Sequence, residues 1–186
     1  MSLSDALSAA PLSRFPLPVG DGHVLQVETL GEPSGEPVLV LHGGAASLEA
    51  MHFQISDLAA DHLVVAPDSR GHGRSTDVPG PLHYADMADD MIALMDRLHI
   101  ARADVVGWSD GGIVGLDMAM RRPERVGRLV AIGANFDAAG LVSTDNPASP
   151  DNAAFAYDRD NYRRLSPTPD NWPRLYAQVT RLWRDE

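Results

Sequence analysis

The chain has 186 residues, of which 44% are hydrophobic and 22% charged, and it carries a formal net charge of -11. This length suits one domain with a single core, and the composition is that of an ordinary soluble globular protein. The acidic balance disfavours phosphate backbones and anionic lipids, so we expect neither nucleic acid nor a membrane surface as a partner. Cysteine is absent, which excludes disulfides, thiolate metal sites and a cysteine nucleophile.

The beginning of the chain has neither the basic segment nor the apolar core of a secretory signal. No apolar run reaches the length that a membrane-spanning helix needs. We therefore expect a cytoplasmic location by default.

Alternating apolar runs and helical periodicities organise the chain after a small, polar N-terminal arm at residues 1–13. We predict strands at residues 14–19, 23–30, 37–41, 62–66, 104–106 and 128–132, and helices at residues 47–61, 84–98 and 109–121. Ser47 is the expected cap of the first helix. This order, β-β-β-α-β-α-β-α-β, predicts an α/β fold with an open, doubly wound, mostly parallel sheet.

The pattern changes after the core, which we place at residues 14–134. Residues 135–186 are interrupted by prolines and rich in aromatic side chains, and only residues 173–183 show a clear helical pattern. We expect this region to contain short helices and loops and no further strand layer.

The stretch Gly107-Trp108-Ser109-Asp110-Gly111 joins an apolar strand directly to a helical pattern. Such a Gly-x-Ser-x-Gly turn places the serine in a strained conformation above the sheet, at a helix N-terminus that favours negative charge. The alternative is an ordinary strand-to-helix turn in which Ser109 only caps the helix. The strand-turn-helix context favours a nucleophile.

Two further glycine-rich turns follow neighbouring strands. Gly43 and Gly44 come directly after the strand at 37–41, where their N–H groups would face the carboxyl edge of the sheet. The N–H of Gly44 could pair with that of Asp110 to bind an oxyanion. His72 lies between glycines in the turn after the strand at 62–66, which favours a structural role over a catalytic one.

These three motifs, in this order, resemble the α/β-hydrolase superfamily of serine hydrolases. They are His-Gly after the third strand, Asp-x-Arg-Gly-His-Gly-x-Ser after the fourth and Gly-x-Ser-x-Gly after the fifth. The version Gly-Trp-Ser-Asp-Gly-Gly is most similar to the biphenyl-hydrolase-like group, which includes valacyclovir hydrolase. The resemblance covers residues 14–134, and it makes residues 135–186 the start of a helical lid.

The resemblance implies a role for each matching residue. Ser109 would be the catalytic nucleophile, and Gly44 and Asp110 would donate to the oxyanion. Gly43, Trp108 and Asp110 would contact a small-molecule ester or acyl substrate, with Asp110 able to recognise a substrate amino group. The reaction needs no cofactor and no metal.

The sequence departs from the family in one respect that matters for chemistry. All seven histidines precede Ser109, and no strand-like run follows Trp183, so the expected catalytic aspartate and histidine are absent. We therefore expect a C-terminally truncated copy containing strands one to six, with little or no esterase activity by itself. The open edge of the sixth strand would favour a homodimer.

Three interpretations remain open at this stage. The first is a hydrolase of esters or related acyl compounds acting through an acyl-enzyme on Ser109. The second is a non-catalytic protein that keeps the fold for binding. The third is one half of an assembly whose partner supplies the aspartate and histidine. The same motif also serves C–C hydrolases and perhydrolases.

Overall fold

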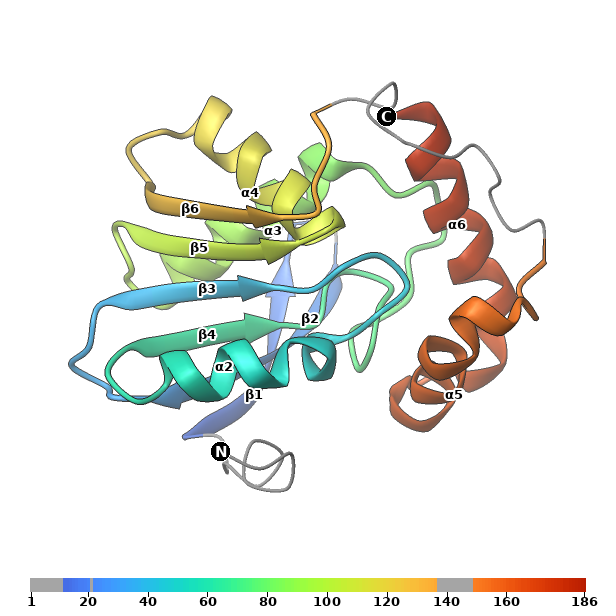
Figure 1. Cartoon of the computed structure of the whole chain (residues 1–186), viewed down its shortest axis with the longest axis horizontal. Coiled ribbons are helices and arrows are strands. Elements are labelled where there is room, and N and C mark those ends of the chain that lie inside the picture. Colours follow the sequence, from blue (N-terminus) through green and yellow to red (C-terminus); the bar gives the residue numbers. More distant parts are fainter. Residues whose placement is uncertain (1–11, 21, 137–148) are drawn as a thin grey trace.

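The computed structural model describes residues 12–20, 22–136 and 149–186, and it contains a six-stranded sheet in the order β1-β2-β4-β3-β5-β6. The strands are β1 (Ser13–Val19), β2 (His23–Gly31), β3 (Pro37–Leu41), β4 (Leu63–Pro67), β5 (Ala103–Trp108) and β6 (Val126–Ile132). The pairs β1–β2 and β2–β4 are antiparallel, whereas β4, β3, β5 and β6 run parallel (Figure 1). The predicted open, mostly parallel α/β sheet is confirmed.

Helices cover both faces of this sheet. The 3₁₀ helix η1 (Leu48–Met51) and α2 (His52–Leu58) lie on one face, and α3 (Tyr84–Arg97) and α4 (Asp110–Arg121) lie on the other (Figure 1). None of the helices in the described ranges is both long and apolar enough to cross a bilayer.

The apolar run of β3 shows why this arrangement forms. Successive strand residues point to opposite faces. Val38 and Val40 accordingly join the cluster under α2, while Leu39 and Leu41 join the larger cluster under α3 and α4. A strand buried on both faces needs apolar residues at every position, which is why β3 reads as a continuous apolar run.

The predicted helix at residues 47–61 is shorter in the structure and is capped differently. Ser47 occupies the cap position of η1, but its side chain makes no capping hydrogen bond. The N–H of Leu48 instead donates to the buried carboxylate of Asp68 at 2.8 Å. The expectation that the Ser47 side chain caps this helix was wrong, because the carboxylate of Asp68, from a loop distant in the sequence, accepts from the first turn instead.

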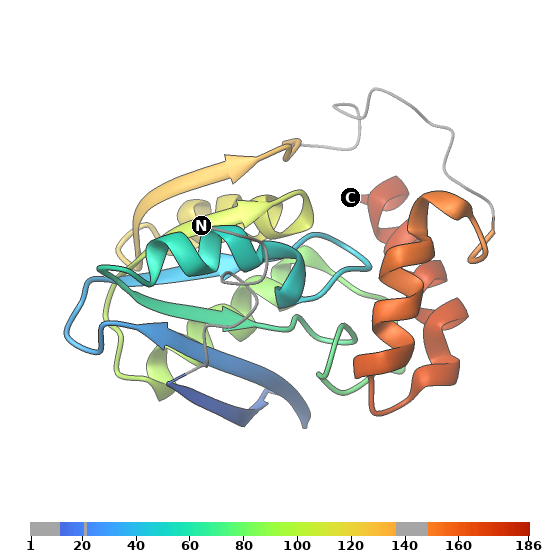
Figure 2. The same cartoon turned by 60° about the horizontal axis from the view of Figure 1, so that its bottom comes forward.

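The C-terminal segment packs beyond the carboxyl ends of the parallel strands (Figures 1 and 2). Its elements are η3 (Ala153–Phe155), α5 (Ala156–Leu165), η4 (Pro169–Asn171) and α6 (Trp172–Asp185). The buried residues of α6 repeat at helical spacing and belong to the main core cluster; they are Trp172, Leu175, Tyr176, Val179 and Leu182. Residues 137–148 of the predicted lid and residues 1–11 of the predicted arm lie outside the described residues.

Candidate active site

Ser109 lies between the last residue of β5 and the first residue of α4, with φ 52° and ψ -120°. This region of backbone space costs a residue other than glycine roughly 1–3 kcal/mol. The N–H of Ser109 donates to the carbonyl of Ile132 at 2.8 Å, and its own carbonyl accepts from Gly112 at 2.8 Å and Ile113 at 3.1 Å. Bonds to β6 and to the first turn of α4 therefore hold the strained residue in place.

Close backbone contacts explain the glycines on both sides of Ser109. A Cβ atom at Gly107 would lie 2.3 Å from the carbonyl oxygen of Gly111. A Cβ at Gly111 would lie 2.3 Å from the carbonyl oxygen of Leu41 in β3. Any larger residue would push α4 away from the sheet, so these glycines set the sharpness of the turn.

The loop after β3 lies directly on this turn. A Cβ built on Gly43 would be 3.0 Å from the ring of Trp108 and 3.2 Å from Cβ of Ser109. Ala45 has a φ of 62°, so the loop bends sharply just beyond Gly44. No backbone carbonyl of the described residues accepts from the N–H groups of Gly44 and Asp110. The backbone of the described residues therefore leaves both donors unused, although the N–H of Asp110 also donates to its own side chain.

Asp110 is the buried charge of the site, with 4% of its surface exposed. Its Oδ1 accepts from Nε1 of Trp183 in α6 at 2.8 Å, whereas its Oδ2 has no hydrogen-bond partner among the described residues. Burial raises the pKa of Asp110 to about 6, although hydrogen bonds from Trp183 and Tyr84 act against that rise. Burial also raises the pKa of the Tyr84 hydroxyl, and the nearby Asp110 carboxylate raises it further.

Trp108 is 41% exposed and lines a pocket of about 540 Å³. The other residues around this pocket come from the α2 region, from the end of β6 and from the start of α5; they are Ala50, Met51, His52, Gln54, Ile132, Tyr157 and Asp158. Burial raises the pKa of Asp158 to about 6. The volume lies within the usual range of small-molecule pockets.

Neither buried histidine near the loops contacts Ser109 through a hydrogen bond. Nδ1 of His42 bonds to the carbonyl of Gly43 at 2.7 Å, and Nδ1 of His72 bonds to the carbonyl of Arg70 at 2.8 Å. Burial lowers the pKa of His42 to about 4 and that of His72 to about 3, so both are neutral near pH 7. This placement agrees with the structural role predicted for His72.

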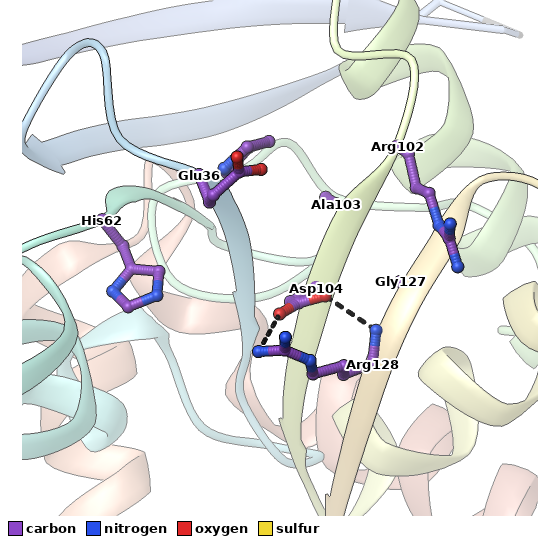
Figure 3. Close-up of a pocket in the computed structure, with 8 residues that line it drawn as sticks. Glu36, His62, Arg102, Ala103, Asp104, Gly127 and Arg128 are labelled. Carbon is purple, nitrogen blue, oxygen red and sulfur yellow. Dashed lines mark hydrogen bonds and ion pairs between the residues drawn. The ribbon is translucent and has the colours of Figure 1, made fainter.

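A second pocket, of about 420 Å³, opens at the opposite end of the sheet near Glu36 and His62 (Figure 3). There Asp104 accepts from the backbone N–H of Arg128 at 2.7 Å and pairs with its guanidinium at 3.7 Å. These charges neutralise each other at the amino ends of the strands. They are not part of the site around Ser109.

The structure brings all the predicted site residues together, because Gly43, Gly44, Trp108 and Asp110 surround Ser109. The aromatic side chains of the C-terminal region were expected near the substrate, but the hydrogen bond from Trp183 to Asp110, 73 positions away, was not predicted. Val179 of α6 was expected to face inward, but its place against the Gly43–Gly44 loop was missed, where its Cγ1 would lie 2.9 Å from a Cβ on Gly44. Both contacts depend on how α6 docks, which periodicity alone does not specify.

The raised pKa of Asp110 leads to a prediction about stability. Because its usual pKa is 3.8 and its folded pKa is about 6, the folded state retains a proton that the unfolded state loses in this interval. The contribution of Asp110 to stability is therefore greatest below pH 4 and decreases as pH rises to about 6. Relative to Asp110→Asn, the wild type should lose on the order of 3 kcal/mol of unfolding free energy across this window. Urea unfolding at several pH values measures the difference, and a difference independent of pH would contradict the assignment.

Comparison with known proteins agrees with this geometry. Residues 36–183 match the family model described as "alpha/beta hydrolase fold". The chain is 38% identical over 110 residues to "Putative carbamate hydrolase RutD" of Rhizobium rhizogenes, covering 59% of this chain and 42% of that protein. It is 36% identical over 104 residues to 2-hydroxymuconate semialdehyde hydrolase of a Pseudomonas species, covering 54% of this chain and 37% of that protein.

Solved structures show the same fold. A hydrolase from Pseudomonas aeruginosa superposes with a TM-score of 0.71 at 23% identity, covering 94% of this chain and 73% of that one. The chain spans less than half the length of the two curated relatives. The family model matches most residues of the chain, including the strained serine between β5 and α4. The chain belongs to the α/β-hydrolase fold family.

Proposed function

We propose that the protein is a serine hydrolase of carboxylic esters or related acyl compounds and that Ser109 forms the acyl-enzyme. The observation that carries this proposal is the backbone of Ser109, with φ 52° and ψ -120° at the junction of β5 and α4. A serine that only caps a helix has no need of this strain. The strain is understandable if the hydroxyl must project from the sheet toward a substrate.

The surrounding donors suit the charge that acyl transfer develops. When the hydroxyl of Ser109 attacks a carbonyl carbon, the carbonyl oxygen becomes an oxyanion. The N–H groups of Gly44 and Asp110, which no backbone carbonyl of the described residues accepts, would bind it, and the N-terminus of α4 adds a favourable dipole. Losing one such donor typically costs about 3 to 4 kcal/mol of transition-state stabilisation.

The substrate would occupy the space beside Gly43 and Trp108. The Trp108 pocket, with Met51 and Ile132 in its wall, suits an apolar acyl or alcohol group. Carbamates, which the name of one relative mentions, have a carbonyl carbon open to the same attack. Asp110 would contribute through its N–H, because Trp183 covers its carboxylate and a substrate amino group could reach it only if α6 moved.

The described residues place no histidine base at Ser109, whose hydroxyl instead donates to the buried carboxylate of Asp110. The buried histidines nearest the loops, His42 and His72, donate from Nδ1 to backbone carbonyls, and no hydrogen bond links either to Ser109. An unactivated serine hydroxyl is a weak nucleophile. We therefore propose that the complete reaction uses an aspartate and a histidine from beyond these 186 residues, and that the oxyanion donors alone give slow acylation.

Acylation of Ser109 by an activated ester tests the proposed nucleophile. Incubated with p-nitrophenyl acetate, the 186-residue chain should become acetylated at Ser109, because an oxyanion hole and binding alone retain about 10³–10⁴-fold of rate over water. Intact-mass and peptide mass spectrometry would locate the acetyl group. Continuous turnover should be little or none.

Two variants make this result specific. Ser109→Ala should abolish the acetylation, whereas Ser34→Ala, which removes a hydroxyl from an exposed loop, should leave it unchanged. Equal acetylation of Ser109→Ala and wild type would contradict the nucleophile. A ligand that binds equally well to both, with no acetylation of either, would favour the non-catalytic binding protein.

We also propose that β6 makes contact with a second copy of the chain. It pairs only with β5 among the described strands, and its residues Val130 and Ile132 are 52% and 40% exposed. Unpaired strand edges with apolar side chains readily add another strand. Such an edge-to-edge homodimer would cover this surface.

Sedimentation velocity tests the proposed dimer. The wild type should sediment as a dimer and Val130→Lys as a monomer, because the lysine places a charge on the shared surface. Leu12→Lys is the matched control, since Leu12 is 54% exposed just before β1 at the other edge of the sheet. A monomeric wild type, or equal dissociation of both variants, would contradict the proposal.

A further inference from the structure

A small cavity lies between the loop after β3 and the first turn of α4. Its volume is about 10 Å³, which is about the space that one water molecule needs. Its wall is formed by the loops after β3 and β4 and by the helices α3 and α4. The lining residues are His42, Gly43, Gly44, Ser69, His72, Met87, Asp110, Gly111 and Val114. The mechanism proposed for Ser109 makes no use of this cavity.

Two of the residues that line the cavity carry a buried polar atom without a partner. Within the described ranges, neither Nε2 of His72 nor Oδ2 of Asp110 has a hydrogen-bond partner, although both atoms are inaccessible to solvent. Only 1% of His72 and 4% of Asp110 is exposed. Leaving such atoms unpaired costs free energy, so buried polar groups in native proteins nearly always have a partner.

The hydrogen bonds of the histidine ring define what that partner must be. The carbonyl oxygen of Arg70 can only accept, so Nδ1 of His72, 2.8 Å away, is the protonated nitrogen. The neutral ring then presents a bare lone pair at Nε2. The carboxylate oxygen of Asp110 is also an acceptor. A small molecule in the cavity that donates two hydrogen bonds would satisfy both acceptors.

We propose that this cavity is a binding site for one water molecule that donates one hydrogen to His72 Nε2 and the other to Asp110 Oδ2. A water molecule has two donors, so both acceptors are satisfied and none of its hydrogens is left unpaired. The water would thereby link two residues between which no hydrogen bond is present in the described part of the chain.

The water would act as a positioning element for the two oxyanion donors. Oδ2 of Asp110 lies 2.3 Å from the position of a Cβ on Gly44, so the carboxylate supports the loop that carries the Gly44 N–H. The water would connect that carboxylate to the turn after β4, which contains His72. His72 is thus a positioning residue, acting on Gly44 and Asp110 through the water without touching the substrate.

Two measurements on the unmodified chain test the site. A high-resolution crystal structure, grown without ammonium salts so that only water can occupy the cavity, should show a peak within hydrogen-bond distance of both atoms. Oxygen-17 relaxation dispersion should detect a long-lived internal water in solution. An empty cavity, or a peak that contacts only one of the two atoms, would overturn the proposal.

A pair of matched variants assigns the signal. His72→Phe removes the acceptor and fills the space, and it should lower the number of long-lived waters by one per chain. His52→Phe is the control, because Nε2 of His52 is also buried without a partner in the described part of the chain, but His52 lines the larger Trp108 pocket. The control should keep the wild-type number of long-lived waters, because a water at His52 would exchange through that larger pocket. An unchanged number in His72→Phe would overturn the proposal, and the crystallographic result decides it even if that variant does not fold.

Discussion

The backbone contact between α4 and the sheet is the constraint on which the site depends. The carbonyl of Leu41 lies so close to Gly111, and that of Gly111 so close to Gly107, that no side chain fits at either glycine. The helix can begin only immediately after β5, and Ser109 must take up the change of direction with a positive φ. The strain at Ser109 is thus the cost of bringing a helix N-terminus onto the carboxyl end of β3, where the Gly43–Gly44 loop emerges.

The second determinant of the site is the docking of α6 across this edge. Its apolar side chains join the main core, while Trp183 bonds to the buried carboxylate of Asp110 and Val179 lies against Gly44. The helix α6 thus covers the Gly43–Gly44 loop and also positions the carboxylate of Asp110 beside Ser109. Trp183 of α6 donates a hydrogen bond to one carboxylate oxygen of Asp110, and the inferred water would donate to the other. One residue would thus connect the lid-side helix, the oxyanion loop and the turn containing His72.

Much of the core was predictable, because its signals are local. The continuous apolar runs of β3 and β4 indicate burial on both faces, and the spacing of Gly107, Ser109 and Gly111 describes one turn whose atoms are close in sequence. The predicted cap at Ser47 was wrong because Asp68, distant in sequence, accepts from the first turn instead. The contact of Trp183 with Asp110 and the cavity beside His72 were not predictable, since both arise from the packing of separate elements.

The unfolding free energy of Gly111→Ala, compared with that of Gly80→Ala, tests the central constraint most directly. At Gly111 the added methyl group would meet backbone of β3, whereas at Gly80 it would meet nothing within 4 Å. Urea unfolding should show a loss of about 3 kcal/mol for Gly111→Ala, at the upper end of overpacking costs, because a strand carbonyl cannot move aside. Gly80→Ala should stay within about 0.5 kcal/mol of the wild type. Equal stabilities of the two variants would show that the turn at Ser109 does not depend on this contact and would contradict the account.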